Sequence, residues 1–142
     1  MTLWLSLINA TTQNTLQLAA AIRNGEIAKS LSLVTELINL NEPALKIVAT
    51  LVGVFRTWTC VKLMIEKGEK NEQVIAAFAE ISNPKRIYFL RQEVHSLSLQ
   101  KLLATLPILL DLELSLKKGS PPLSSLQTKV IQLSELFGKN YM

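Results

Sequence analysis

Cysteine and histidine, on which most metal and nucleophile chemistry depends, are almost absent from this sequence of 142 residues. Cys60 is the only cysteine and His95 the only histidine. The sequence therefore excludes an internal disulfide, and it lacks the several cysteine or histidine ligands of a typical zinc site. A lone histidine at a helix end and a lone cysteine in a core helix usually cap or pack, so we expect neither to be catalytic. A single free thiol suits a reducing compartment, and we expect a cytoplasmic protein.

Glycine motifs and long apolar runs are also missing. None of the five glycines stands in the setting of a Walker phosphate loop, in which glycines precede Lys-Ser or Lys-Thr, so nucleotide hydrolysis is not expected. The longest strongly apolar uncharged runs, residues 47–55 and 102–110, reach about half of the roughly 20 residues that a membrane-spanning helix needs. No basic residue precedes the apolar stretch from Leu3 to Ile8, as a signal peptide requires. We therefore expect no membrane partner.

The acidic residues are scattered rather than paired. Asp111 and Glu113 are two positions apart in a segment predicted to be helical, which points their side chains to different sides. No acid/base pair is recognisable elsewhere. We therefore expect no enzymatic activity in this chain, and no cofactor, metal or small-molecule substrate.

What the sequence does contain is a large share of aliphatic residues. Hydrophobic residues make up 49% of it but aromatic residues only 6%, which favours helices over sheets. Apolar spacings of three and four, together with caps and turns, predict seven helices. They cover about residues 15–24, 26–39, 43–67, 71–81, 84–95 and 99–118, and the stretch from the Pro121-Pro122 break to Gly138.

These segments predict an all-α fold, an antiparallel helical bundle of about six to seven helices. Residues 14–142 should form this single domain, and residues 1–13 a leader or linker from a longer parent chain. The helix from Pro43 to Lys67 should be central, because it is apolar except for a narrow strip. That strip consists of Lys46, Thr50, Gly53, Thr57 and Cys60. The residues expected to be buried in the next two helices are Val74, Ile75, Phe78 and Ile81, then Ile87, Leu90 and Val94, with Phe89 as a further candidate.

The helix over residues 99–118 contains Pro107, which should kink it, and a charged pair near its end. Its predicted wet side consists of Gln100, Lys101, Thr105, Asp111, Ser115 and Lys118. Glu113 and Lys117 fall on the other side, and their i,i+4 spacing with glutamate first favours an ion pair. The residues on the same side of this helix as Glu113 and Lys117 are Leu99, Leu102, Leu106 and Leu110. Two interpretations stay open: a partly buried pair that orients this helix against a neighbouring helix or a partner subunit, or a solvated pair at the helix end.

Residues 73–95 show a weak likeness to a helix-turn-helix, whose second helix carries three basic residues. Those residues are Lys85, Arg86 and Arg91. Most of the other side chains of the second helix are expected to pack against the core, so few remain to contact base edges, which disfavours direct recognition of a base sequence. Phosphate contact by the three cations and a simple solvated face both stay open, since a net charge of +4 spread along the chain is no nucleic-acid footprint. A small helix-turn-helix DNA-binding regulator is therefore the alternative function.

Four stretches in order along the chain carry a family resemblance. They are residues 43–56, the Asn83-Pro84 turn leading to residues 90–93, residues 96–103, and residues 109–119. In the last stretch Glu113, Lys117 and Gly119 match a pattern of an acid, three residues and Lys-x-Gly. From Thr15 to Phe137 the sequence resembles the C-terminal domain of the delta subunit of bacterial DNA polymerase III, part of the sliding-clamp loader. It departs from the family in having Glu113 where aspartate is usual and Asn83 where histidine is common.

The resemblance implies a helical collar domain that joins clamp-loader subunits into a ring of five. The ATPase-like fold and the clamp-opening element belong to separate N-terminal domains of such subunits. The implied partners are the other clamp-loader subunits, with DNA and the sliding clamp reached through the parent complex. The parent subunit would belong to the polymerase holoenzyme without being its catalytic subunit. Glu113 and Lys117 become candidate orienters of the last helices.

Overall fold

The computed structural model describes residues 2–138, and the side chains of residues 13–138. Seven helices and no strand lie in this part of the chain. Their bounds are α1 Thr2–Arg23, α2 Ile27–Asn39, α3 Ala44–Glu66, α4 Glu72–Ala79, α5 Arg86–Val94, α6 Leu99–Lys117 and α7 Pro122–Phe137. The all-α prediction and the predicted order of helices are confirmed.

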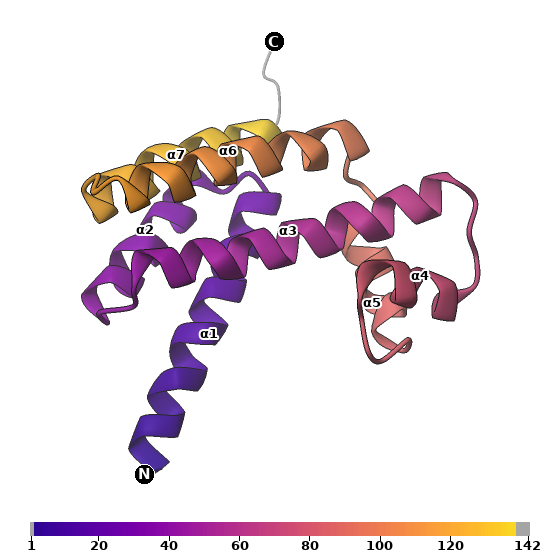
Figure 1. The fold of residues 1–142 in the computed structure, drawn as a ribbon, viewed down its shortest axis with the longest axis horizontal. Helices are drawn as coiled ribbons and strands as arrows, with labels where there is room; N and C mark the ends of the chain where they lie inside the picture. The colour runs from indigo at the N-terminus through magenta and orange to yellow at the C-terminus, as the bar shows by residue number, and fades with distance from the viewer. Residues whose placement is uncertain (1, 139–142) are drawn as a thin grey trace.

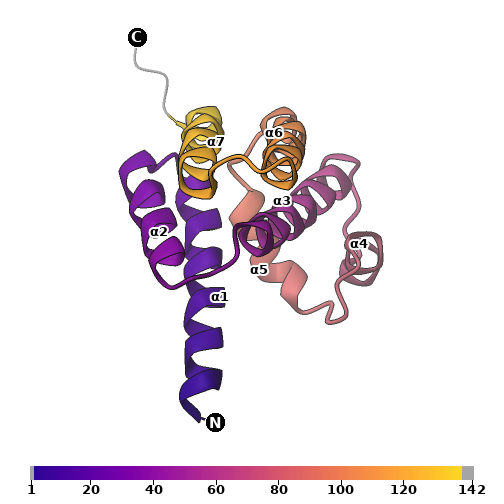
Figure 2. The same cartoon turned by 60° about the vertical axis from the view of Figure 1, so that its left-hand side comes forward.

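The longest helix, α3, lies at the centre, as its almost continuous apolar surface predicts. It contacts α1, α4, α5, α6 and α7. Helices α6 and α7 lie along one side of it, whereas α4, α5 and the projecting first part of α1 lie toward the other side (Figures 1 and 2). By length and composition α3 could also cross a membrane, with a mean hydropathy of 1.5. The core helix of a bundle meets the same test, and 39% of this apolar window of α3 is buried against the neighbouring helices.

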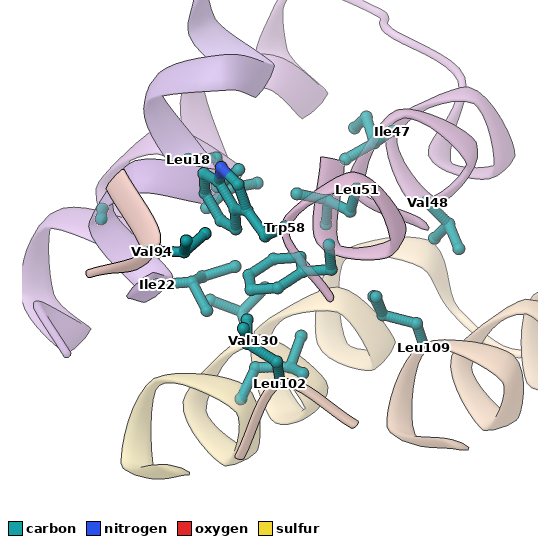
Figure 3. Close-up of a cluster of buried hydrophobic side chains, with 14 of the residues drawn as sticks. Leu18, Ile22, Ile47, Val48, Leu51, Trp58, Val94, Leu102, Leu109 and Val130 are labelled. Carbon is teal, nitrogen blue, oxygen red and sulfur yellow. The ribbon is translucent and has the colours of Figure 1, made fainter. Parts of the chain in front are cut away.

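The hydrophobic core takes side chains from all seven helices, and Figure 3 shows the part of it where α1, α3, α5, α6 and α7 converge. Phe55 of α3 is fully buried in it. The Phe55 ring meets the Trp58 ring edge to face, with centroids 5.0 Å apart, and stacks on Phe137 of α7 at 6.2 Å. Each such large side chain contributes about 1.5–3 kcal/mol through burial alone.

Local capping chemistry places several helix ends where the sequence predicts them. The Asn71 side chain accepts hydrogen bonds from the backbone N–H groups of Gln73 and Val74, at 2.9 and 3.4 Å, and so begins α4. Gly68 adopts a φ of +86° just after α3, a left-handed conformation that lets the last carbonyl groups of the helix find donors. These ends need no tertiary contact to form.

The start of α1 differs from the prediction. The helix begins at Thr2 rather than near Thr15, and so runs through the segment predicted to be a leader or linker. Asparagine and threonine each cost only a few tenths of a kcal/mol in a helix, so the polar residues around Thr11 and Thr12 do not interrupt it. No glycine or proline interrupts the chain before Gly25. That residues 1–13 come from a longer parent chain stays a prediction.

Several faces of the shorter helices were predicted wrongly. Val74, Phe78 and Phe89 are 41%, 46% and 63% exposed, and Ala76 and Ala79 are buried instead. Helix α4 is only eight residues long and apolar on nearly every side, so its sequence pattern does not reveal which side meets α3.

The buried face of α6 is also rotated from the predicted one. Thr105, placed on the wet side, is buried, and its hydroxyl donates to the Leu102 carbonyl oxygen at 2.6 Å. Leu110, expected to face the core, is 54% exposed. Leucine occurs all round this helix, so a helical wheel leaves its orientation undetermined. The helix continues through Pro107, and the kink there stays a prediction.

Replacing Gly25 with alanine should destabilise the fold more than a similar change at Gly68. Both glycines have positive φ, which costs an alanine about 1–2 kcal/mol. A Cβ atom on Gly25 would also lie 2.8 Å from the Gly138 Cα, whereas one on Gly68 meets nothing within 4 Å. We expect Gly25→Ala to lower the free energy of unfolding by about 2–4 kcal/mol, measured by urea denaturation. Equal losses in the two variants would contradict the proposed clash.

Candidate functional site

The predicted Glu113–Lys117 pair forms an ion pair near the end of α6. The Lys117 Nζ lies 3.8 Å from the Glu113 Oε1. The Lys117 side chain is 59% exposed and the Glu113 side chain 37%, so within this chain the pair is largely solvated. A surface pair of this kind contributes at most about 1 kcal/mol to stability. Whether it orients a partner subunit stays a prediction.

An exposed apolar stripe runs along the outer side of α6 toward this pair. It consists of Leu103, Pro107, Leu110 and Leu114, and we call these residues the outer α6 stripe. Their spacing of four, three and four places them on one side of the helix. The three leucines are 46–54% exposed, while Leu102, Leu109 and Leu112 on the inner side are fully buried. Helix α6 is therefore apolar on two sides, and the described part of the chain covers only one.

A second ion pair lies on another flank of α6. The Lys129 Nζ of α7 lies 2.5 Å from the Asp111 Oδ2. Asp111 is exposed, as predicted, but its partner was not predicted, because Lys129 lies on the other side of the Gly119–Pro122 turn. This pair joins α6 to α7.

The three basic residues predicted near α5 have different environments. Lys85 and Arg86 are exposed. Arg91 is half-buried, and its Nη2 atom donates to the carbonyl oxygens of Glu69 and Lys70 at 3.4 and 3.2 Å. Arg91 thus anchors the loop between α3 and α4, so only Lys85 and Arg86 remain fully available to a partner.

An aromatic pair beside these cations was not predicted. Tyr88 and Phe89 of α5 are 58% and 63% exposed, and their rings meet edge to face with centroids 5.3 Å apart. Phe89 was predicted only as a candidate core residue. The sequence does contain a signal for this pair. Ile87, Leu90 and Val94 already form the buried face of α5, so Tyr88 and Phe89 are left on its other sides.

A charged junction joins α1, α3 and α5. The Arg23 guanidinium lies 4.9 Å from the centre of the Trp58 ring and 3.9 Å from the Glu93 carboxylate. The indole N–H of Trp58 donates to the same carboxylate at 3.2 Å. Glu93 therefore binds the end of α1 and the middle of α3 at once.

A groove of about 570 Å³ lies beside this junction. Its floor is the small-residue face of α3, formed by Thr50, Gly53, Val54 and Thr57. Leu16 and Ala20 of α1 form one wall, and Leu90 of α5 lies on the other. Near its rim Arg56 is paired with Glu80 at 3.2 Å, and the pKa of Arg56 is raised by its hydrogen bond to this carboxylate and by the carboxylate charge. Three of the five residues of the predicted polar strip of α3, Thr50, Gly53 and Thr57, thus line a groove.

Neither residue considered for nucleophile or metal chemistry has a suitable neighbour in the part of the chain that the structure describes. His95 is exposed, and its backbone carbonyl accepts from Lys62 Nζ at 3.1 Å. Cys60 is half-buried against the core. Among residues 2–138 no group of three or more histidine, cysteine or acidic residues could hold a metal ion.

The chain is similar to known proteins both in sequence and in fold. A family model described as DNA polymerase III delta subunit, C-terminal domain, matches residues 12–132. Among solved structures, the Bacillus subtilis DNA clamp loader delta protein (YqeN) has a similar fold, with a TM-score of 0.74 and 24% sequence identity. That match covers 88% of this chain but only 37% of the Bacillus subtilis chain. No curated protein sequence matches.

The family match and the fold agree with each other. The matched residues begin in α1 and end in α7, so they include all or part of each of the seven helices. They also contain Glu113, Lys117 and Gly119, the residues that carried the sequence resemblance. This chain therefore belongs to the family formed by the C-terminal domains of DNA polymerase III delta subunits.

Proposed function

We propose that this chain is the assembly domain of a clamp-loader delta subunit and that the outer α6 stripe is its main contact with neighbouring subunits. In this proposal the chain joins a cytoplasmic ring of five subunits. It supports loading of the sliding clamp onto primed DNA, and it catalyses no reaction itself. DNA and the clamp are then reached through the parent complex.

The observation that carries this proposal is the outer α6 stripe. Soluble monomers rarely leave a contiguous apolar patch uncovered, and such patches commonly mark protein interfaces. Interfaces also combine an apolar centre with a polar rim. Lys117 follows Leu114 by three residues and so continues the line of the stripe, with Glu113 beside it. A rim pair in this position adds orientation and specificity more than affinity.

Leu110→Glu should weaken assembly without unfolding the chain. Leu110 is 54% exposed, so a carboxylate there is solvated in the free domain but buried without a partner at an interface. We expect the Kd for the other clamp-loader subunits, measured by surface plasmon resonance, to rise at least about tenfold. Val74→Glu, on the exposed side of α4, is the matched control and should leave the Kd unchanged. Equal binding by both variants would overturn the assignment of the stripe.

Glu113→Ala tests the two interpretations of the ion pair. Because the pair is largely solvated, we expect the free energy of unfolding to fall by no more than about 0.5 kcal/mol. If the pair borders an interface, assembly should weaken by more than stability does, as measured by co-purification with the other subunits and by thermal unfolding of the free chain. Unchanged stability together with unchanged assembly would reject an orienting role.

A second candidate function is direct contact with single-stranded DNA by the exposed face of α5. The aromatic pair Tyr88 and Phe89 offers a stacking surface, and Lys85 and Arg86 beside it offer phosphate contacts. This arrangement differs from a helix-turn-helix reader, because the aromatic residues recognise bases without sequence preference.

A DNA titration at two salt concentrations separates these candidates. We expect weak, sequence-independent binding by the chain, measured by fluorescence anisotropy with a labelled single-stranded oligonucleotide. Removing Lys85 should reduce the slope of log affinity against log salt by about 1 if it contacts a phosphate. Tight, sequence-selective binding to duplex DNA would instead favour the helix-turn-helix regulator.

A further inference from the structure

The groove over α3 lies apart from the outer α6 stripe. The groove opens between one wall formed by α1 and another formed by α5, whereas α6 and α7 lie along the opposite side of α3 (Figure 1). Its volume of about 570 Å³ falls in the range of sites that hold several side chains or a small ligand. Subunit assembly through the outer α6 stripe gives no role to this second surface.

Gly53 is the feature of the groove that the fold of this chain does not explain. It lies in the interior of α3, where glycine is destabilising by about 1 kcal/mol relative to alanine. Its backbone needs no positive φ, and a Cβ atom added to it would meet nothing within 4 Å. None of the described neighbouring helices therefore makes use of the missing side chain. Glycine at such a position lets a group from outside approach the helix closely.

One of the cations around the groove has no ion-pair partner among the described residues. Arg23 is paired with Glu93, and Arg56 with Glu80. Arg86, which also lines the groove, is exposed and has no ion-pair partner among the described residues. The apolar walls next to it are formed by Leu16, Ile81 and Leu90. The groove thus offers an apolar surface with a positive charge at its edge.

These features favour a peptide over a nucleic acid as the occupant. Sites that bind single-stranded bases without sequence preference typically offer accessible aromatic faces on which the bases stack. Among the described residues Trp58 is the one aromatic side chain that lines the groove, and it is only 4% exposed, with Arg23 over its ring. Aliphatic walls beside small residues suit the side chains on one face of a partner helix. The exposed Arg86 guanidinium suits a carboxylate.

We propose that this groove binds a segment of a partner protein that carries an aliphatic side chain close to a carboxylate. The aliphatic side chain lies over Gly53, between the walls from α1 and α5. The carboxylate pairs with Arg86. This contact is additional to subunit assembly through α6 and does not depend on it.

Peptide selection tests the proposal directly. A random peptide library displayed on phage is selected against the immobilised chain, and enriched peptides are measured by fluorescence anisotropy. We expect them to share an aliphatic residue near an acid. Gly53→Leu fills the floor and Arg86→Glu reverses the charge, so each should raise the Kd at least about tenfold. Lys29→Glu is the matched control, because Lys29 is exposed on α2 and does not line the groove. It should change the Kd less than about twofold.

Stability distinguishes a blocked groove from a damaged fold. Leucine is a better helix former than glycine, and a Cβ atom at this position meets nothing within 4 Å, so Gly53→Leu should raise the urea midpoint while weakening peptide binding. The proposal is overturned if no peptide is enriched, if enriched peptides lack acids, or if Gly53→Leu leaves binding intact. Binding of a labelled single-stranded oligonucleotide that is lost in Gly53→Leu would assign the groove to nucleic acid instead, because Gly53 lines the groove but not the exposed face of α5.

Discussion

One turn of α3 holds the bundle together through Phe55 and Trp58. Phe55 is fully buried and packs on the Phe137 ring of α7, while Trp58 packs on Phe55 and binds the Glu93 carboxylate of α5. Arg23 lies over Trp58 and thereby adds the end of α1. Helices far apart in the sequence are thus held at one place by two large side chains three residues apart.

The central position of α3 explains which surfaces are left for partners. Because α3 is covered by several helices, most of the large apolar residues that remain exposed in the described part of the chain lie on other helices, including α4, α5 and α6, and Leu45 at the start of α3 is the exception within it. In α6 they form the continuous stripe next to Glu113 and Lys117. The chain belongs to the family of C-terminal domains of DNA polymerase III delta subunits, and the apolar face that its own fold leaves uncovered is the feature on which the proposed subunit assembly rests.

The polar strip of α3 shows what a local sequence pattern leaves undetermined. Thr50, Gly53 and Thr57 were recognised as the less apolar side of the helix, and a solvated face would be the ordinary explanation. The structure places all three in the floor of a groove. Their neighbours there come from α1 and α5, which are distant in the sequence, so no local pattern could reveal the walls or the charges at the rim.

Local signals were enough to define the helices and most of their ends, because caps and turns depend on residues only a few positions apart. Asn71 begins α4, and Gly68 ends α3, through hydrogen bonds within their own segments. The i,i+4 spacing of Glu113 and Lys117 likewise predicted their ion pair. Tertiary packing decided the rest: the buried side of the leucine-rich α6, the exposure of Phe89, and the loop contact of Arg91. Those outcomes depend on which helices meet in space, and a helix that is apolar on several sides carries no information about which side will be covered.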